Sequence, residues 1–302
     1  MKAAFYLLIA LGAGLSAPTA WAQFLSSGTA TVTLSMNGTT GGSPMNIAWD
    51  PTFQQYYGGM GGNANYTGVV WNSSGSAIQL LTPLNTDLRS FYYNSHTGNI
   101  EDVTFSASTA SDNYGYFTAG LDGSGLLTGI YTSKGVVLSG LPSSQTVPSY
   151  DAGRNLLYGL DNNAHSVAAV SPDTGLVVTT ITLDLASAGT SSIMQDSIGY
   201  DPANNALISF TSTGGYRALA FNATTGAFLA SISLPGLSSP ANDYGLGFAN
   251  GQLFIYDGNL NAYRGYLLSP VPEPATAALL AVGLLAVVVA GRQRRRRRVQ
   301  EA

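Results

Sequence analysis

The residues best suited to acid–base chemistry or metal binding are few and widely separated. Only two histidines occur, His96 and His165, and both lie among turn-forming residues. An imidazole can act as a base or as a metal ligand, but isolated histidines in turns are typical of exposed loops. The chain has no cysteine, which excludes disulfides, thiolate zinc sites and thiolate nucleophiles.

Three aspartates form the second candidate set. Asp50, Asp151 and Asp201 each occupy the same position in a recurring turn. A symmetric fold would bring them to equivalent places, where a pair of carboxylates could cleave a glycosidic bond. A residue that is repeated in every unit more often shapes the turn itself, so we predict a structural role for these three.

Other short motifs are incomplete. Asp112–Asn113 and Asp161–Asn163 lack the spacing of a calcium loop. The run Gly58–Asn63 lacks the lysine and the following helix of a phosphate-binding loop, and we interpret it as a flexible loop. We therefore predict a protein that is not an enzyme and that has no metal and no cofactor.

Tyrosines are frequent and cluster in the first half of the chain. Exposed tyrosines can stack on sugar rings, whereas buried ones would pack between structural repeats, and both interpretations remain open. The clustered tyrosines are Tyr56, Tyr57, Tyr66, Tyr92, Tyr93, Tyr114 and Tyr116.

The composition limits both the partners and the fold. Between Gln23 and Pro270 the chain carries five basic and fourteen acidic residues, a net charge of −9. Binding to phosphates needs basic side chains, so we exclude nucleic acid as a partner. Glycine and turn formers recur throughout this segment without strongly helical stretches, which predicts an all-β fold.

Internal repeats narrow the architecture. Segments that open on an aromatic residue start at Trp49, Tyr150 and Tyr200, with weaker openings at Tyr92–Asn94 and Phe248–Gly251. Each continues into two strands joined by a short turn that contains glycine, which supplies a positive φ. These second halves are Val69–Gly75, Gly129–Val137, Val167–Val178 and Ala218–Leu229.

Four to five such units, each of about four short strands, fit the blades of a β-propeller. We favour five blades over six, and a β-sandwich or a solenoid is the alternative. The last unit is short of strands, and the alternating run Gly28–Ser35 is expected to complete it. Residues 48–268 are similar to exported propellers of the NHL and YVTN kind.

The N-terminus has the order of a signal peptide. Lys2 precedes an apolar run from Ala3 to Leu15, and Ala20-Trp21-Ala22 fits a small-x-small cleavage site. We predict a signal peptide over residues 1–22, cleaved between Ala22 and Gln23, followed by an exported domain over residues 23–268.

Residues 269–302 have the order of a membrane anchor. The segment Val271-Pro272-Glu273-Pro274 precedes 17 uncharged residues at 275–291, long enough for a helix of roughly 25 Å. The basic tail 292–298 would keep this end cytoplasmic by the positive-inside rule, and its arginines are Arg292, Arg294, Arg295, Arg296, Arg297 and Arg298.

This order resembles the PEP-CTERM sorting signal of exported proteins of Gram-negative bacteria that make exopolysaccharide. The resemblance implies recognition by an exosortase, cleavage near Pro272–Pro274 and loss of the transmembrane helix. Val271, Pro272, Glu273 and Pro274 would then be a processing site, and the released domain would lie at the cell surface or in the extracellular matrix.

We therefore expect a secreted, non-enzymatic protein of the surface or matrix, linked to biofilm exopolysaccharide through its propeller. The alternatives are an exported polysaccharide-processing propeller enzyme and a plain membrane-anchored protein that keeps its tail.

Overall fold

The computed structural model describes residues 28–105, 115–161, 165–240 and 244–268, and the backbone of 23–24 and 270–271. By its contacts the chain divides into two units, Phe24–Ser269 and a second unit formed by Met1–Gln23 with Pro270–Ala302. The predicted signal peptide and the predicted helix 275–291 lie outside the described residues. Within the described part, no helix is both long enough and apolar enough to cross a membrane.

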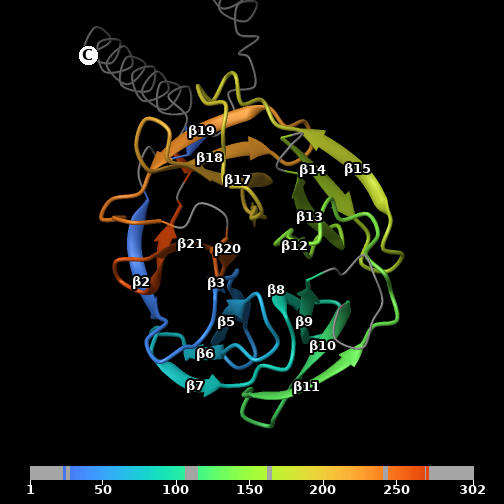
Figure 1. Cartoon of the computed structure of the whole chain (residues 1–302). Helices are drawn as coiled ribbons and strands as arrows, with labels where there is room; N and C mark the ends of the chain where they lie inside the picture. Colours follow the sequence, from blue (N-terminus) through green and yellow to red (C-terminus); the bar gives the residue numbers. More distant parts are fainter. Residues whose placement is uncertain are drawn as a thin grey trace, which may run out of the picture. The chain divides into compact units, whose positions relative to one another are not determined.

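The unit Phe24–Ser269 is an all-β propeller of five blades, as the repeats predict (Figure 1). Blade 1 contains β3 (Ser43–Pro44), β4 (Ala48–Asp50), β5 (Gln55–Gly61), β6 (Gly68–Asn72) and β7 (Ala77–Leu81). Blade 2 contains β8 (Leu88–Asn94), β9 (Asn99–Thr104), β10 (Tyr116–Leu121) and β11 (Leu127–Ser133). Blade 3 contains β12 (Ser149–Asp151), β13 (Leu156–Asp161), β14 (Ser166–Val170) and β15 (Val177–Thr182).

The last two blades follow the same plan. Blade 4 contains β16 (Gly199–Asp201), β17 (Ala206–Thr211), β18 (Arg217–Asn222) and β19 (Phe228–Ser233). Blade 5 contains β20 (Leu246–Ala249), β21 (Gln252–Asp257), β22 (Ala262–Leu267) and, as its outer strand, β2 (Thr29–Ser35). A separate two-stranded pair joins β1 (Gln23–Phe24) to β23 (Pro270–Val271).

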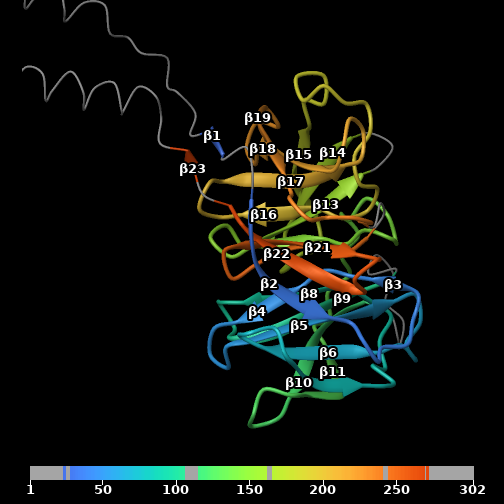
Figure 2. The same cartoon turned by 90° about the vertical axis from the view of Figure 1, so that its left-hand side faces the viewer.

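The ring is closed by the two ends of the propeller segment. β2 pairs antiparallel with β22, with Leu34 opposite Tyr263, so the predicted role of Gly28–Ser35 is confirmed. In Figures 1 and 2 the blue β2 lies beside the orange and red strands of blade 5. The inner strands touch in the cyclic order β4, β8, β12, β16, β20 and back to β4.

The hydrophobic core is divided among the five junctions between neighbouring blades, one buried cluster at each. Alternate residues of one strand serve different junctions, because each blade is covered on both faces. In β13, for example, Leu157 packs toward blade 2 and Tyr158 packs toward blade 4. This explains why the middle strands are nearly all buried and show no polar face.

The first turn of blades 1, 3 and 4 uses the repeated aspartate. The Oδ1 atoms of Asp50, Asp151 and Asp201 accept hydrogen bonds from the backbone N–H groups two residues later, at 2.7, 2.9 and 3.0 Å. The turns end on residues with positive φ, such as Asn155 and Asn205. The structural interpretation of the three aspartates is confirmed.

The last turn of a blade, between its third and fourth strands, touches the blade before it. Gly226 has a φ of +72°, and a Cβ built on it would lie 1.8 Å from the carbonyl oxygen of Thr182. Gly175 stands in the same relation to Val137, also at 1.8 Å. Glycine is required at these positions for two reasons: the left-handed conformation and the close approach of two backbones.

Two local expectations are wrong. Gly58–Gly61 is not a flexible loop, because it belongs to β5, where a Cβ on Gly61 would lie 2.2 Å from the Leu88 oxygen. Gly129–Val137 is not a strand–turn–strand unit: Gly129 lies in the outer strand β11, and the matching turn of blade 2 is Asp122–Gly125. Glycine in a strand here marks close packing of neighbouring backbones.

Candidate functional site

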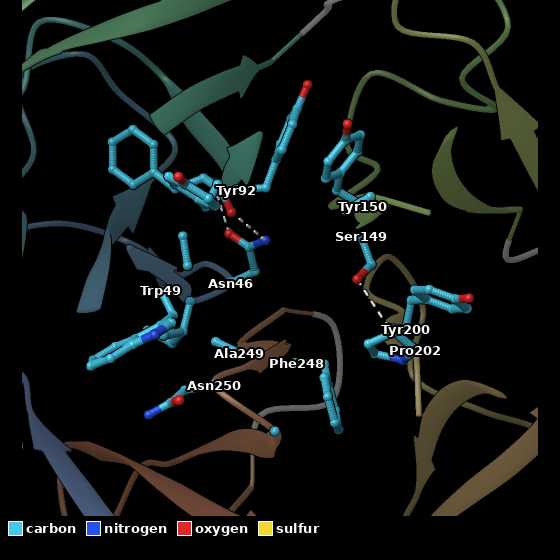
Figure 3. Close-up of a pocket in the computed structure, with 16 residues that line it drawn as sticks. Asn46, Trp49, Tyr92, Ser149, Tyr150, Tyr200, Pro202, Phe248, Ala249 and Asn250 are labelled. Atoms are coloured by element: carbon cyan, nitrogen blue, oxygen red, sulfur yellow. Dashed lines mark hydrogen bonds between the residues drawn. The ribbon is translucent and has the colours of Figure 1, made fainter. Parts of the chain in front are cut away.

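The inner strands enclose a pocket of about 190 Å³ at the end where they lead into their first turns. Every blade contributes to its wall (Figure 3). The sixteen lining residues are Asn46, Ile47, Ala48, Trp49, Phe91, Tyr92, Tyr93, Ser149, Tyr150, Ala152, Tyr200, Pro202, Phe248, Ala249, Asn250 and Gly251.

None of these lining residues is acidic, basic or a histidine. Tyr150 and Tyr200 stay neutral, because burial raises the pKa of Tyr150 to about 12 and raises that of Tyr200 further. The pocket therefore offers aromatic carbon, amides and hydroxyl groups, and it offers no charge at neutral pH.

The aromatic members hold equivalent places in the repeat. Trp49, Tyr150 and Tyr200 each directly precede the aspartate of the first turn, while Tyr93 precedes Asn94 and Phe248 stands one residue before the end of β20. The sequence signal that could have found this site is therefore the shared position. The sequence shows the aromatic openings as repeats, and the symmetry of the ring brings them together at the opening of one pocket.

These rings lean outward over the neighbouring blades, as Figure 3 shows for Trp49, Tyr150, Tyr200 and Phe248. Trp49 contacts Tyr56 of its own blade with ring centroids 4.5 Å apart and packs against the cluster between blades 5 and 1. Tyr150 of blade 3 stacks on Tyr92 of blade 2 at 4.4 Å. Packing between blades is thus the main role of these rings. All but Tyr200 among them remain partly exposed, so ring surface surrounds the mouth.

Hydrogen bonds between inner strands fix the pocket walls. Asn46 donates from Nδ2 to Ser90 Oγ at 2.7 Å and to the Phe91 oxygen at 3.0 Å. Ser90 Oγ donates in turn to the Pro148 oxygen at 2.7 Å, and Ser149 Oγ accepts from the Tyr200 N–H at 3.0 Å. These bonds join blades 1 to 4 in sequence.

Asn250 and Ser149 are among the lining side chains that keep hydrogen-bonding capacity for a ligand. Asn250 donates from Nδ2 to the Tyr56 hydroxyl at 2.9 Å, and no described residue donates to its Oδ1. Ser149 uses its oxygen as an acceptor, and no acceptor for its hydroxyl proton is found among the described residues. These two side chains give the pocket an acceptor and a donor beside its aromatic rim.

A buried glutamate holds one wall tyrosine in place. Glu101 Oε2 accepts from the hydroxyl groups of Tyr92 and Tyr116, and Oε1 accepts from Lys134 Nζ at 2.7 Å. Burial would raise the pKa of Glu101, but these hydrogen bonds outweigh it, and the net pKa is lowered. Glu101 does not line the pocket, so this hydrogen-bond network orients Tyr92 from outside the pocket wall.

Neither histidine lines this pocket, although His96 bonds to the lining residue Ala152. His96 shares a hydrogen bond of 2.8 Å between its Nε2 and the Ala152 oxygen, and His165 lies beside an open cavity with Asp184. Across the described ranges, no three His, Cys, Asp or Glu side chains come close enough to hold a metal ion. Asp112–Asn113 and Asn162–Asn163 lie outside those ranges.

A second cavity, of about 420 Å³, lies where the inner strands begin. Its one cation, Arg89, donates from Nη1 to Asp87 at 2.8 Å and from Nη2 to Gln145 at 3.0 Å. The guanidinium is also held between the rings of Phe105 and Tyr244. Its charge is thus compensated within the protein, which makes the uncharged pocket the better candidate.

The C-terminal segment indicates how the chain is sorted and processed. Residues 270–296 match the PEP-CTERM protein-sorting motif. The chain is an exported exosortase substrate. The PEP-CTERM match contains Val271–Pro274 and the first arginines of the tail, and it indicates transient anchoring by the C-terminal region.

Comparison with solved structures supports the fold. Glutaminyl cyclase from Myxococcus xanthus superposes with a TM-score of 0.51 at 11% identity, covering 82% of this chain and 98% of that chain. A protein of unknown function from Bacteroides thetaiotaomicron gives 0.43 at 13% identity, covering 77% of this chain and 60% of that one. At such identities the likeness concerns the fold alone. No curated protein matches the chain by sequence.

Proposed function

We propose that the propeller is a non-enzymatic binding module for a neutral glycan, displayed at the cell surface or in the extracellular matrix after sorting. The observation that carries this proposal is the uncharged central pocket with its aromatic rim. Ligand pockets usually combine apolar walls with a few placed polar groups. Sugar rings present a C–H face to aromatic carbon and hydroxyl groups to amides, which matches this wall.

The lining also favours binding over turnover. Glycosidases use a pair of carboxylates at the scissile bond. The repeated aspartates hold turns, and Glu101 is buried behind Tyr92. A link to biofilm exopolysaccharide follows from this ligand class and from the export route, and it is part of the proposal.

Binding is tested with the exported domain, residues 23–268, and four neutral polysaccharides: dextran, mannan, galactan and laminarin. Alginate serves as the acidic comparison. We expect at least one neutral polymer to bind and alginate not to bind. Failure of all four neutral polymers would remove the proposed function, and release of new reducing ends would favour a processing enzyme.

Loss of rim aromatics should weaken binding. We expect Trp49→Ala and Tyr150→Ala each to lower affinity about fivefold, since an aromatic contact contributes roughly 1 kcal/mol. Tyr216→Ala is the matched control, because Tyr216 is 42% exposed and does not line the pocket. Melting temperatures of all variants are compared, and Trp49→Phe should recover most of the affinity. Equal losses in all three alanine variants would contradict the site.

Processing of the tail has its own test. Replacing Glu273 by Ala should leave uncleaved, membrane-bound protein, because the PEP-CTERM segment is what the sorting protease is expected to read. Membrane fractionation and intact mass are the measurements. Glu301→Ala is the control, since it removes an equal charge outside the matched residues. Normal release of the Glu273 variant would show that cleavage does not depend on this residue.

A further inference from the structure

We propose that the central pocket takes the end of a neutral glycan chain or of a side branch, and not an internal segment. This inference rests on the proposed function and specifies the ligand of the same site. It comes from the shape of the pocket, which is set by where the five inner strands meet.

The wall is closed on every side. Residues from all five blades line it, and the inner strands contact one another around the full circle. When an internal segment of a polymer lies in a groove, the groove must be open at both ends so that the chain can continue in both directions. This pocket has a wall in each lateral direction, so an internal segment would have to fold back through the same mouth.

Neighbouring inner strands also stay in contact below the pocket. Ser90 and Pro148, joined by their 2.7 Å bond, are not among the lining residues and lie one step further toward the start of the strands. Between blades 5 and 1, a Cβ on Gly247 would lie 2.8 Å from the Ile47 nitrogen. Between blades 4 and 5, a Cβ on Gly199 would lie 3.2 Å from Leu246 Cδ2. A glycan therefore has no sideways exit between the blades at these three junctions.

The volume agrees with this geometry. Pockets for drug-sized ligands are usually about 300–1,000 Å³. A volume of about 190 Å³ is below that range and leaves room for a terminal sugar ring but not for a longer stretch of chain. The donor of Ser149 and the acceptor of Asn250 lie on blades 3 and 5, so the polar groups stand on two separate walls.

The charge of the pocket and of the domain favours uncharged terminal sugars over acidic ones. No cation lines the pocket, and residues 23–270 carry a net charge of −9. A terminal uronic acid would lose hydration without gaining a partner. We therefore assign the pocket to uncharged terminal sugars.

The experiment uses the exported domain and the neutral polymer that binds in the panel above. That polymer is compared intact and after partial hydrolysis to about a tenth of its length. End recognition predicts about ten times more binding sites per gram of hydrolysed polymer. It also predicts that the disaccharide binds within about threefold of the hexasaccharide. Calorimetry gives both the number of sites and the affinity.

A pair of variants ties the result to the pocket. Asn250 and Asn261 both have positive φ, at 50° and 47°, and both bond to a tyrosine hydroxyl, but only Asn250 lines the pocket. Asn250→Gly should lower affinity for the disaccharide about fivefold, and Asn261→Gly should not.

The outcomes separate the two proposals. Binding that strengthens with each added sugar up to the hexasaccharide, with no gain in sites on hydrolysis, would overturn end recognition and leave glycan binding intact. Equal effects of the two asparagine variants would overturn the assignment of this pocket. Absence of binding to every neutral polymer would instead remove the function on which the inference rests.

Discussion

Gly226→Ala should lower the free energy of unfolding by about 3 kcal/mol. The left-handed conformation of an L-residue contributes roughly 1–2 kcal/mol, because the φ here is +72°. The rest comes from the new methyl group, which would lie 1.8 Å from the Thr182 oxygen and push blade 4 away from blade 3. Overpacking of this kind costs about 1–3 kcal/mol. For a domain of this size the expected drop in melting temperature is roughly 6–12 °C.

The control isolates the contact between blades. Gly251 has a φ of +71°, almost that of Gly226, but a Cβ there meets nothing within 4 Å. Gly251→Ala should therefore show the conformational part alone, about 1–2 kcal/mol. Equal losses in the two variants, measured by chemical denaturation, would mean that the blades separate easily at this turn.

Asp102→Asn should change how stability depends on pH. Asp102 is fully buried between blades 1 and 2, and neither of its oxygens accepts a hydrogen bond of normal length from the described residues. The nearby Thr86 hydroxyl and the charge of Arg89 lower its pKa, but burial has the larger effect. Burial raises the pKa of this carboxyl from 3.8 to about 8. Below pH 8 the folded protein therefore keeps a proton that the unfolded chain releases above about pH 4.

The sign of the effect follows from proton linkage. Between pH 4 and pH 8 the folded state binds more protons than the unfolded state, so Asp102 destabilises the fold progressively as pH rises. With a folded pKa of about 8, the loss between pH 5 and pH 8 is on the order of 4 kcal/mol, since each pH unit contributes about 1.4 kcal/mol. The asparagine variant lacks this loss.

The readout is the difference in melting temperature between variant and wild type, followed from pH 5 to pH 8. We expect the melting temperature of Asp102→Asn, relative to that of the wild type, to rise by roughly 8–16 °C from pH 5 to pH 8. A constant offset from the amide does not affect the slope. Asp122→Asn, which changes an exposed turn aspartate, serves as the control. A flat difference for Asp102→Asn would show that the buried carboxyl is ionised at both ends of the range.

The repeats made the architecture predictable. Aspartate before the first turn of blades 1, 3 and 4 and glycine in the last turn of blades 1 to 4 are local requirements of backbone conformation, so they are visible in the sequence. The five blades and the closing strand Gly28–Ser35 follow from counting those units. The prediction for Gly129–Val137 in blade 2 is wrong, because a glycine inside a strand looks the same in sequence as a glycine in a turn.

The candidate site is harder to predict from the sequence than the fold. Glu101 and Asp102 are adjacent acids, a pattern usual at surfaces, yet both are buried because β9 lies between two other blades. Their side chains face opposite junctions. The aromatic positions Trp49, Tyr150 and Tyr200 were visible as repeats, but their convergence on one pocket depends on the closure of the ring. That closure is a long-range property of the whole domain.

Closure by β2 also sets an order of events during export. A chain that crosses the membrane N-terminus first delivers Thr29–Ser35 at the beginning, and its partner strand Ala262–Leu267 arrives more than 200 residues later. The first strand must stay unpaired during that interval, because the ladder between Leu34 and Tyr263 joins two sequence-distant segments. The propeller can therefore be completed only after almost the entire exported part has crossed the membrane. Folding and passage across the membrane end together, just before the sorting motif.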